Sequence, residues 1–172
     1  MAYLIDSSYF QSGRCAINNV ESTSWAGTSK SADIASFIAT YEPEYLTKLL
    51  GRTLYDYVMA HPTEARIVTL VAKLRDEDKC TSPIASYVYY MYTQQSQVVQ
   101  TESGDKESAP AGFSTVANLA RHVSLWNSMV TSSVSISDWL AENVSIYPEY
   151  EETSEDDLDP YDIFHNINVI GL

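Results

Sequence analysis

Positive charge is missing from the last third of this chain. The 172 residues include 10 Lys or Arg and 23 Asp or Glu, for a formal net charge of −13. Residues 1–121 contain 13 acids and 10 bases, whereas residues 122–172 contain 10 acids and no Lys or Arg. Binding to duplex nucleic acid depends on Lys and Arg that release counterions, and docking on an anionic membrane needs the same charges. Both functions are therefore disfavoured.

Cysteine is scarce, and long apolar runs are absent. Cys15 and Cys80 are the only two cysteines, and nothing in their spacing pairs them. In a protein made in the cytosol, two thiols are more often buried apolar residues than a disulfide. No run of about eighteen apolar residues exists, so we expect no membrane span. No positive charge precedes the short apolar run at Tyr3–Ile5, so we predict no signal peptide.

Residue patterns that mark catalytic or metal sites are also missing. The three histidines, His61, His122 and His165, lie far apart and outside any H-x-x-x-H or C-x-x-C setting, so a zinc site is unsupported. The six glycines form no phosphate-binding cluster, and no serine lies in a G-x-S-x-G elbow. We therefore predict no cofactor, no metal and no catalysis.

Helical periodicity is what the chain does contain. Between Ser31 and His61, apolar residues recur at spacings of three and four, which is typical of a helix with one buried face. We predict three short helices in this stretch, with breaks at Pro43 and Gly51. The residue before a proline avoids helical backbone angles, proline suits the first turn of a new helix, and glycine caps the end of a helix.

Four further features complete the expected helical bundle at 31–147. A helix starts at Pro62 and Thr63 and stops in the charged run 75–79. A second starts at Ser82-Pro83, a cap followed by proline, and reaches about Glu102. A polar loop at 102–113 joins it to a helix capped by Ser114, which bends at 131–137, restarts at Ser137 and ends at Tyr147-Pro148. The predicted fold is mainly α, with two long antiparallel helices, shorter helices around them and extended arms at both ends.

The predicted second helix is aromatic nearly all the way round. Tyr87, Tyr89, Tyr90 and Tyr92 crowd about one and a half turns, and a helix that is apolar on every side is buried on several sides. We predict a central helix in contact with its own bundle and with an adjacent copy of the chain. A stacking platform for single-stranded nucleic acid is disfavoured, because no positive charge flanks the tyrosines.

The expected arms are residues 1–30 and 148–172. The first is irregular and carries Trp25, which either pins the arm to its own core or anchors a partner subunit. The end of the second is apolar and either folds back on its own bundle or occupies a groove or sheet edge on another chain. Its candidate interface residues are Tyr161, Ile163, Phe164, Ile167, Val169, Ile170 and Leu172.

Between the bundle and the apolar end lies a strongly acidic stretch. It has eight acids in the fourteen residues 149–162: Glu149, Glu151, Glu152, Glu155, Asp156, Asp157, Asp159 and Asp162. They lack the glycine and the final glutamate of a calcium-binding loop. We interpret them as a solvated acidic surface, extended or partly disordered in the free chain.

Two segments carry a resemblance to a known family. Tyr41-Glu42-Pro43-Glu44-Tyr45-Leu46, followed by Leu49-Leu50-Gly51 and Leu54-Tyr55, resembles the first helices of small head-to-tail connector (adaptor) proteins of tailed bacteriophages. The similarity is greatest to those of Bacteroides-infecting, crAss-like phages. The end of the chain, from Phe164 to Leu172, resembles the short terminus with Asn and Gly that some of these proteins have. Both segments consist of packing residues and helix boundaries and contain no catalytic groups.

The resemblance implies a structural protein of the virion, made in the host bacterial cytoplasm and placed at the head–tail junction. Such proteins form rings, commonly of twelve copies, through which the genome passes without specific binding. The implied partners are copies of the chain itself, the portal protein and other connector or tail proteins. One rival interpretation is an acidic inhibitor that imitates the charge of DNA and binds a DNA-processing enzyme, which accounts for the charge but poorly for the apolar tail. Another is a monomeric adaptor that forms no ring.

Overall fold

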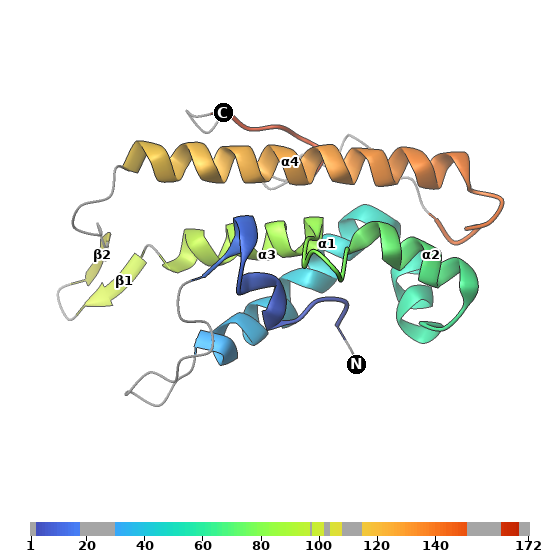
Figure 1. Cartoon of the computed structure of the whole chain (residues 1–172), viewed down its shortest axis with the longest axis horizontal. Coiled ribbons are helices and arrows are strands. Elements are labelled where there is room, and N and C mark those ends of the chain that lie inside the picture. The colour runs from blue at the N-terminus through green and yellow to red at the C-terminus, as the bar shows by residue number, and fades with distance from the viewer. Residues whose placement is uncertain are drawn as a thin grey trace.

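The computed structural model describes residues 3–17, 30–96, 98–101, 104–107, 115–150 and 163–168, and these residues are mainly helical. The elements are the 3-10 turns η1 (Ser7–Phe10) and η2 (Gly13–Cys15), α1 (Lys30–Ala60), α2 (Ala65–Leu74), α3 (Pro83–Ser96), β1 (Val98–Thr101), β2 (Gly104–Glu107) and α4 (Thr115–Glu142). Figure 1 shows α4 running antiparallel to α3 along the length of the molecule, with α1 on the other side of α3. The prediction of a mainly α bundle with a long antiparallel pair is confirmed.

Helix α3 is the centre of the bundle because it packs against α1, α4 and both 3-10 turns. The rings of its tyrosines each meet an aromatic ring of another element. Tyr87 lies 5.5 Å from Tyr45 and Tyr90 lies 4.5 Å from Trp126, measured between ring centroids. Tyr92 meets Phe37 at 5.2 Å and Tyr89 meets His122 at 6.2 Å. A helix that is aromatic on all sides is thus accommodated within one chain.

The predicted break at Pro43 is wrong, and the predicted break at Gly51 is confirmed. Helix α1 continues through Pro43 and loses its helical backbone angles only at Gly51, where φ is 75° and ψ is 160°. Proline inside a helix costs about 3 kcal/mol, but the residues after it bury their side chains completely: Tyr45, Leu46, Leu49 and Leu50. Each such burial contributes about 2 kcal/mol, so packing outweighs the cost of the proline.

The predicted helix to Glu102 is wrong. The predicted loop at 102–113 is corrected over 104–107, and its other residues lie outside the described ranges. Helix α3 ends at Ser96, and β1 and β2 follow as an antiparallel hairpin with Val98 opposite Glu107 and Thr101 opposite Gly104. The two consecutive valines and the threonine of β1 are β-branched and favour a strand over a helix. The helix prediction extends past Ser96 because apolar residues continue at spacings of three and four. That spacing does not reflect the preference of these residues for a strand.

The predicted bend at 131–137 is wrong as well, because α4 is one helix up to Glu142. The hydroxyls of Thr131, Ser132 and Ser133 each donate to the carbonyl four residues earlier, at 2.9, 3.1 and 2.9 Å. These bonds satisfy the polar groups inside the helix. Ser137 starts no new helix, since its Oγ lies 2.8 Å from the hydroxyl of Tyr150.

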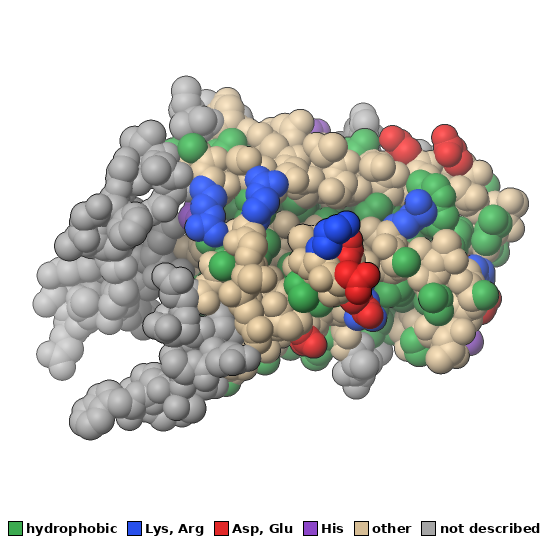
Figure 2. Space-filling view, viewed as in Figure 1, with side chains coloured by type: hydrophobic (Ala, Val, Ile, Leu, Met, Phe, Trp, Pro, Cys, Tyr) green, Lys and Arg blue, Asp and Glu red, His purple; other side chains and the backbone are tan. Residues whose placement is uncertain are grey.

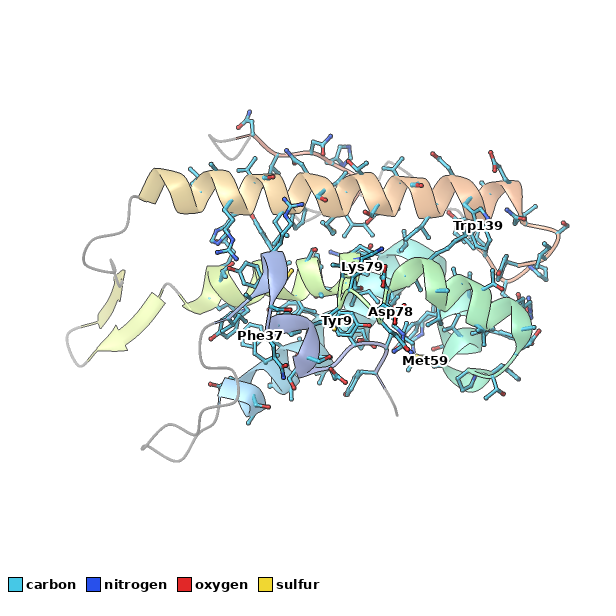
Figure 3. All side chains as sticks on the ribbon, viewed as in Figure 1. Tyr9, Phe37, Met59, Asp78, Lys79 and Trp139 are labelled. Atoms are coloured by element: carbon cyan, nitrogen blue, oxygen red, sulfur yellow. The ribbon has the colours of Figure 1, made fainter. Side chains whose placement is uncertain are left out.

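The described parts of both arms lie on the chain's own bundle. In the N-terminal arm, Ile5, Tyr9 and Phe10 are buried, and Figure 3 shows Tyr9 in front of α1 and α3. In the C-terminal arm, Ile163 is fully buried. Residues 163–168 therefore follow the first of the two alternatives, a segment folded back on its own bundle, and residues 3–17 are part of the same core.

Candidate interaction site

A buried carboxylate fixes the N-terminal segment to the bundle. Glu42, in the middle of α1, is 1 % exposed, and its two carboxyl oxygens accept the backbone N–H groups of Leu4 at 2.7 Å and Ile5 at 3.1 Å. Burial raises the pKa of Glu42 to about 7, although these two bonds and the charge of Arg75 act in the opposite direction. Arg75 in turn donates to the carbonyl of Leu4. These bonds from Glu42 and Arg75 hold residues 3–17 in place, and this segment forms one wall of a groove.

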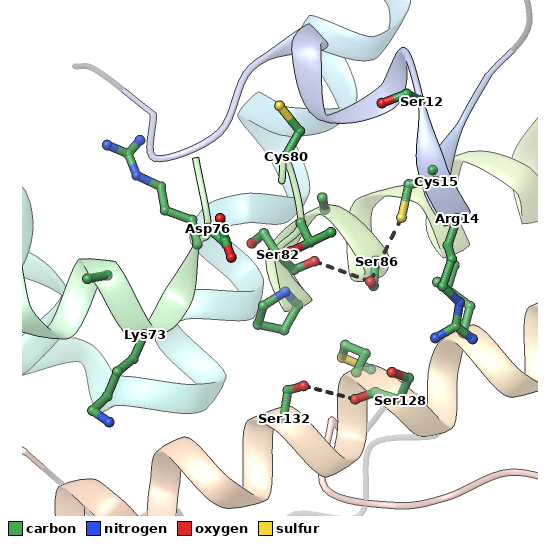
Figure 4. A pocket seen from close by; sticks show the side chains of 18 residues that line it. Ser12, Arg14, Cys15, Lys73, Asp76, Cys80, Ser82, Ser86, Ser128 and Ser132 are labelled. Atoms are coloured by element: carbon green, nitrogen blue, oxygen red, sulfur yellow. Dashed lines mark hydrogen bonds between the residues drawn. The ribbon is translucent and has the colours of Figure 1, made fainter. Parts of the chain in front are cut away.

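The groove has a volume of about 360 Å³ and lies between the N-terminal segment, the turn after α2, the start of α3 and one face of α4. Figure 4 shows Arg14 and Lys73 at opposite ends of it, with Ser86, Ser128 and Ser132 between them. Its cationic lining residues are Arg14, Lys73 and Arg75, and its one acid is Asp76. The floor is apolar and is formed by Ala85, Leu125 and Met129.

Two hydroxyls of the groove bond to nearby backbone groups, and one of its thiols is buried. Ser82 accepts the N–H of Ile84 at 3.1 Å and donates to the carbonyl of Leu74 at 2.8 Å, so it caps α3 as the sequence predicted. Ser86 donates to the carbonyl of Ser82 at 3.2 Å. Burial raises the pKa of Cys15, which keeps its thiol protonated and unreactive. The described lining of the groove contains no histidine.

Two of the three cations that line the groove, Arg14 and Lys73, have no carboxylate partner among the described residues, whereas the third, Arg75, pairs with Glu77. Five described cations form an ion pair: Lys48 with Glu44, Arg52 with Asp56, Arg66 with Glu64 and Glu149, Arg75 with Glu77, and Lys79 with Asp76. Among the described residues, Arg14, Lys73 and Arg121 form none. On the face seen in Figure 2, several Lys and Arg side chains stand apart from any acid.

These three cations are held in place by other contacts. Arg14 donates to Ser124 Oγ at 2.9 Å, and Arg121 donates to the carbonyl of Arg14 at 2.7 Å. The ammonium group of Lys73 lies 4.5 Å from the ring centroid of Trp139, which points from α4 toward α2 in Figure 3. The sequence analysis did not find this set, since its members come from η2, α2 and α4 and share no sequence motif.

A second polar cluster joins α1, α2 and the turn after α4. Arg66 donates to both carboxyl oxygens of Glu149 at 2.8 and 2.9 Å and to one of Glu64 at 2.7 Å. Its guanidinium lies 4.4 Å from the ring centroid of Tyr57. The bonds from Arg66 lower the pKa of Glu149. Glu149, the first residue of the predicted acidic surface, thus acts in a structural ion pair.

The C-terminal segment is held on α4 by two side chains. The indole N–H of Trp126 donates to the carbonyl of His165 at 2.8 Å. The side-chain amide of Asn127 donates to the carbonyl of Ile167 and accepts its N–H, both at 2.9 Å. The sequence analysis missed Asn127. Its only signal in the sequence is an amide that directly follows Trp126.

The predicted interface residues fall into three groups. Tyr87 and Ile163 are fully buried in the chain's own core, and Tyr89 is nearly so. Those that keep an exposed edge are Tyr90, Tyr92, Phe164 and Ile167. Those that lie outside the described residues are Trp25, Tyr161, Val169, Ile170 and Leu172, together with the acids Glu151, Glu152, Glu155, Asp156, Asp157, Asp159 and Asp162.

Metal sites and membrane spans were sought in the same part of the chain. Across the described ranges, no group of three His, Cys, Asp or Glu side chains is placed to hold a metal ion. No helix within those ranges is both long and apolar enough to cross a membrane. No family model, no curated protein and no solved structure matches this chain.

Proposed function

We propose that this chain is a structural subunit of the head-to-tail connector of a tailed bacteriophage. In this proposal twelve copies form a ring between the portal and the tail, and the genome passes through without being bound. The observation that carries the proposal is the resemblance of Tyr41–Leu46, Leu49–Gly51 and Leu54-Tyr55 to the first helices of such proteins.

The positions of these residues in the fold support the proposal. Tyr45, Leu46, Leu49, Leu50 and Leu54 are fully buried and make the main contacts of α1 with the rest of the bundle. The same segment supplies Glu42, which holds the N-terminal arm, and Gly51, which sets the kink of α1. The resembling residues therefore determine the shape of the subunit, as expected for a building block.

The charge of the chain is compatible with a conduit for DNA. A positive lumen would retain the duplex through counterion release, whereas a net charge of −13 per copy repels it. This repulsion extends over about 10 Å at 0.1 M salt. An acidic ring would therefore let the genome slide.

Measurement of the mass of the purified chain, alone and with the portal protein of its phage, tests the proposal. We expect discrete high-order oligomers, or rings that form only on the portal and are visible by negative-stain electron microscopy. A chain that stays monomeric in both conditions contradicts the proposal. A monomer that instead forms a tight complex with a nuclease or another DNA-processing enzyme supports the DNA-mimic interpretation.

A further inference from the structure

The three cations without carboxylate partners are unexpected in a chain with more than two acids for every base. With 23 acids and 10 bases, a cation placed without constraint meets an acid nearby, as Lys48, Arg52, Arg66, Arg75 and Lys79 do. Arg14 and Lys73 instead line one groove, and Arg121 donates to the carbonyl of Arg14 beside it. None of the three pairs with a described carboxylate. Asp76, the acid in that groove, is already paired with Lys79. The positive charge of Arg14, Lys73 and Arg121 is therefore not neutralised by any described carboxylate, and the groove favours a negatively charged ligand.

The groove suits an extended acidic peptide better than DNA. Arg14 and Lys73 flank an apolar floor of Ala85, Leu125 and Met129, so acidic and small apolar side chains fit together. Duplex DNA requires many phosphate contacts, and three cations on a chain of −13 do not supply them.

The sequence of the chain contains a segment with this chemistry. Residues 151–162 hold seven acids, no base, and the apolar or aromatic residues Leu158, Pro160 and Tyr161. Charge complementarity therefore points to this segment as the occupant.

The described residues that flank this segment in the same chain contact a different face of α4 from the one that lines the groove. Leu125, Ser128, Met129 and Ser132 line the groove at i, i+3, i+4 and i+7, which defines one face of the helix. Tyr150 is held by Ser137, and Ile167 by Asn127. At 3.6 residues per turn, Ser137 and Asn127 lie about 130–150° around the helix from the groove face.

We infer that the groove between Arg14 and Lys73 binds the acidic segment 151–162 of a second copy of this chain. The inference rests on the proposed function, because a contact between a groove on one copy and a segment on the next is heterologous and closes into a ring. It gives the acidic segment a role in assembly.

Two complementary variants test the inference in the full chain. The groove variant is Arg14→Glu with Lys73→Glu and Arg121→Glu. The segment variant replaces the seven acids of 151–162 by their amides. The control is Arg52→Glu, because Arg52 is exposed and is not among the residues that line the groove. Circular dichroism checks that each variant keeps its helical content.

We expect neither variant to assemble alone and the control to assemble like the unmodified chain. A mixture of the two variants should form dimers and stop there. The intact segment of the groove variant fits the intact groove of the segment variant, and the other two surfaces are disabled. Assembly of either variant alone overturns the inference and leaves the proposed function intact. A mixture that forms no dimer also overturns it, as does a segment that occupies the groove of its own chain.

A labelled peptide of residues 149–162 separates the inference from the proposed function. If the unmodified chain does not assemble even with the portal, the proposed function fails, but peptide binding still tests the groove by fluorescence anisotropy. We expect at least tenfold weaker binding to the groove variant than to Arg52→Glu, with binding that weakens as salt is added. Equal binding to both variants, equal binding of a scrambled peptide, or groove-dependent binding of a DNA duplex overturns the inference.

Discussion

Glu42 places an ionisable group in the core of the molecule, between α1 and the N-terminal segment. Its ordinary pKa of 4.5 applies to the unfolded chain, and burial raises the pKa to about 7 in the folded chain. Folding therefore favours the protonated carboxyl. The stability that this group contributes is complete below pH 4.5 and is lost as the pH rises through 7. The two pKa values predict a loss of about 2 kcal/mol between pH 5.5 and pH 8.

The variant Glu42→Gln should remove this pH dependence. Gln has one acceptor oxygen where the carboxyl has two, so one of the N–H groups of Leu4 and Ile5 loses its partner. This loss costs about 1–2 kcal/mol at every pH. Urea unfolding from pH 5.5 to pH 8 measures both effects. The exposed Asp56→Asn is the control and should keep the slope of the unmodified chain, and an unchanged slope in Glu42→Gln contradicts the prediction.

A buried hydrogen bond links residues that are 88 positions apart. The hydroxyl of Tyr45 in α1 lies 2.7 Å from Ser133 Oγ in α4, and both residues are fully buried. We expect Tyr45→Phe and Ser133→Ala each to lower the free energy of unfolding by about 1–2 kcal/mol. The double variant should lose about 1 kcal/mol less than the sum, because both single variants remove the same bond. Strict additivity in urea unfolding would show that the bond contributes nothing.

At the scale of elements, Gly51 determines the shape of α1. Its φ of 75° and ψ of 160° lie in a region that is nearly restricted to glycine. We expect Gly51→Ala to lower the free energy of unfolding by about 1–3 kcal/mol. Its neighbour Arg52→Ala removes only an exposed ion pair and should cost less than about 0.5 kcal/mol. Equal effects of the two substitutions in chemical denaturation would contradict a strained position.

The contact between α4 and the C-terminal segment depends on Asn127. Because its amide forms both bonds to the backbone of Ile167, Asn127→Ala should release the backbone at Ile167 and leave the bundle folded. Trp126 still holds His165, and Ile163 stays buried. Hydrogen exchange at the amide of Ile167 should become at least tenfold faster, while amides in α3 stay protected. Thr131→Ala, one turn along α4 with a hydroxyl bonded only to its own helix, is the control. Slow exchange in Asn127→Ala would show that the remaining contacts hold the backbone at Ile167.

The sequence predicts an element correctly when the interaction that determines it joins residues close together in the chain. Ser82 acts through a hydroxyl that accepts an N–H two residues along the chain, and Gly51 acts through its own backbone angles; both predictions are confirmed. Pro43 and the serines of α4 lie in helices whose continuity depends on buried neighbours, and local propensity gives the wrong answer there. The hairpin of β1 and β2 was missed because helical spacing continues past Ser96 while β-branched residues favour a strand.

The groove was beyond sequence reasoning for a different reason. Arg14, Lys73 and Arg121 are more than 40 residues apart in the chain, and only the packing of η2, α2 and α4 brings them to one face. The sequence did show that cations end at Arg121 and that acids dominate afterwards. It did not show which cations lack a carboxylate partner, because a pairing is a distance between side chains.

For the whole molecule, the net charge of −13 opposes the compact state. Two effects compete as salt is added. Screening weakens the described ion pairs, but surface pairs contribute only about 0–1 kcal/mol each. Screening also weakens the mutual repulsion of the excess acids, as the Debye length falls from about 30 Å at 10 mM to about 10 Å at 100 mM. Because repulsion acts among all thirteen excess charges, we expect it to dominate in the dilute monomer.

The melting temperature should therefore rise by about 2–5 °C between 10 and 100 mM salt. Replacing the seven acids of 151–162 by amides takes the net charge from −13 to −6 and should remove at least half of that rise. The pair Arg52→Gln with Asp56→Asn removes one ion pair at constant net charge, so it should leave the rise unchanged. A melting temperature that falls on adding salt would mean that local pairs outweigh repulsion. The acidic segment would then have no electrostatic cost to offset by binding another copy.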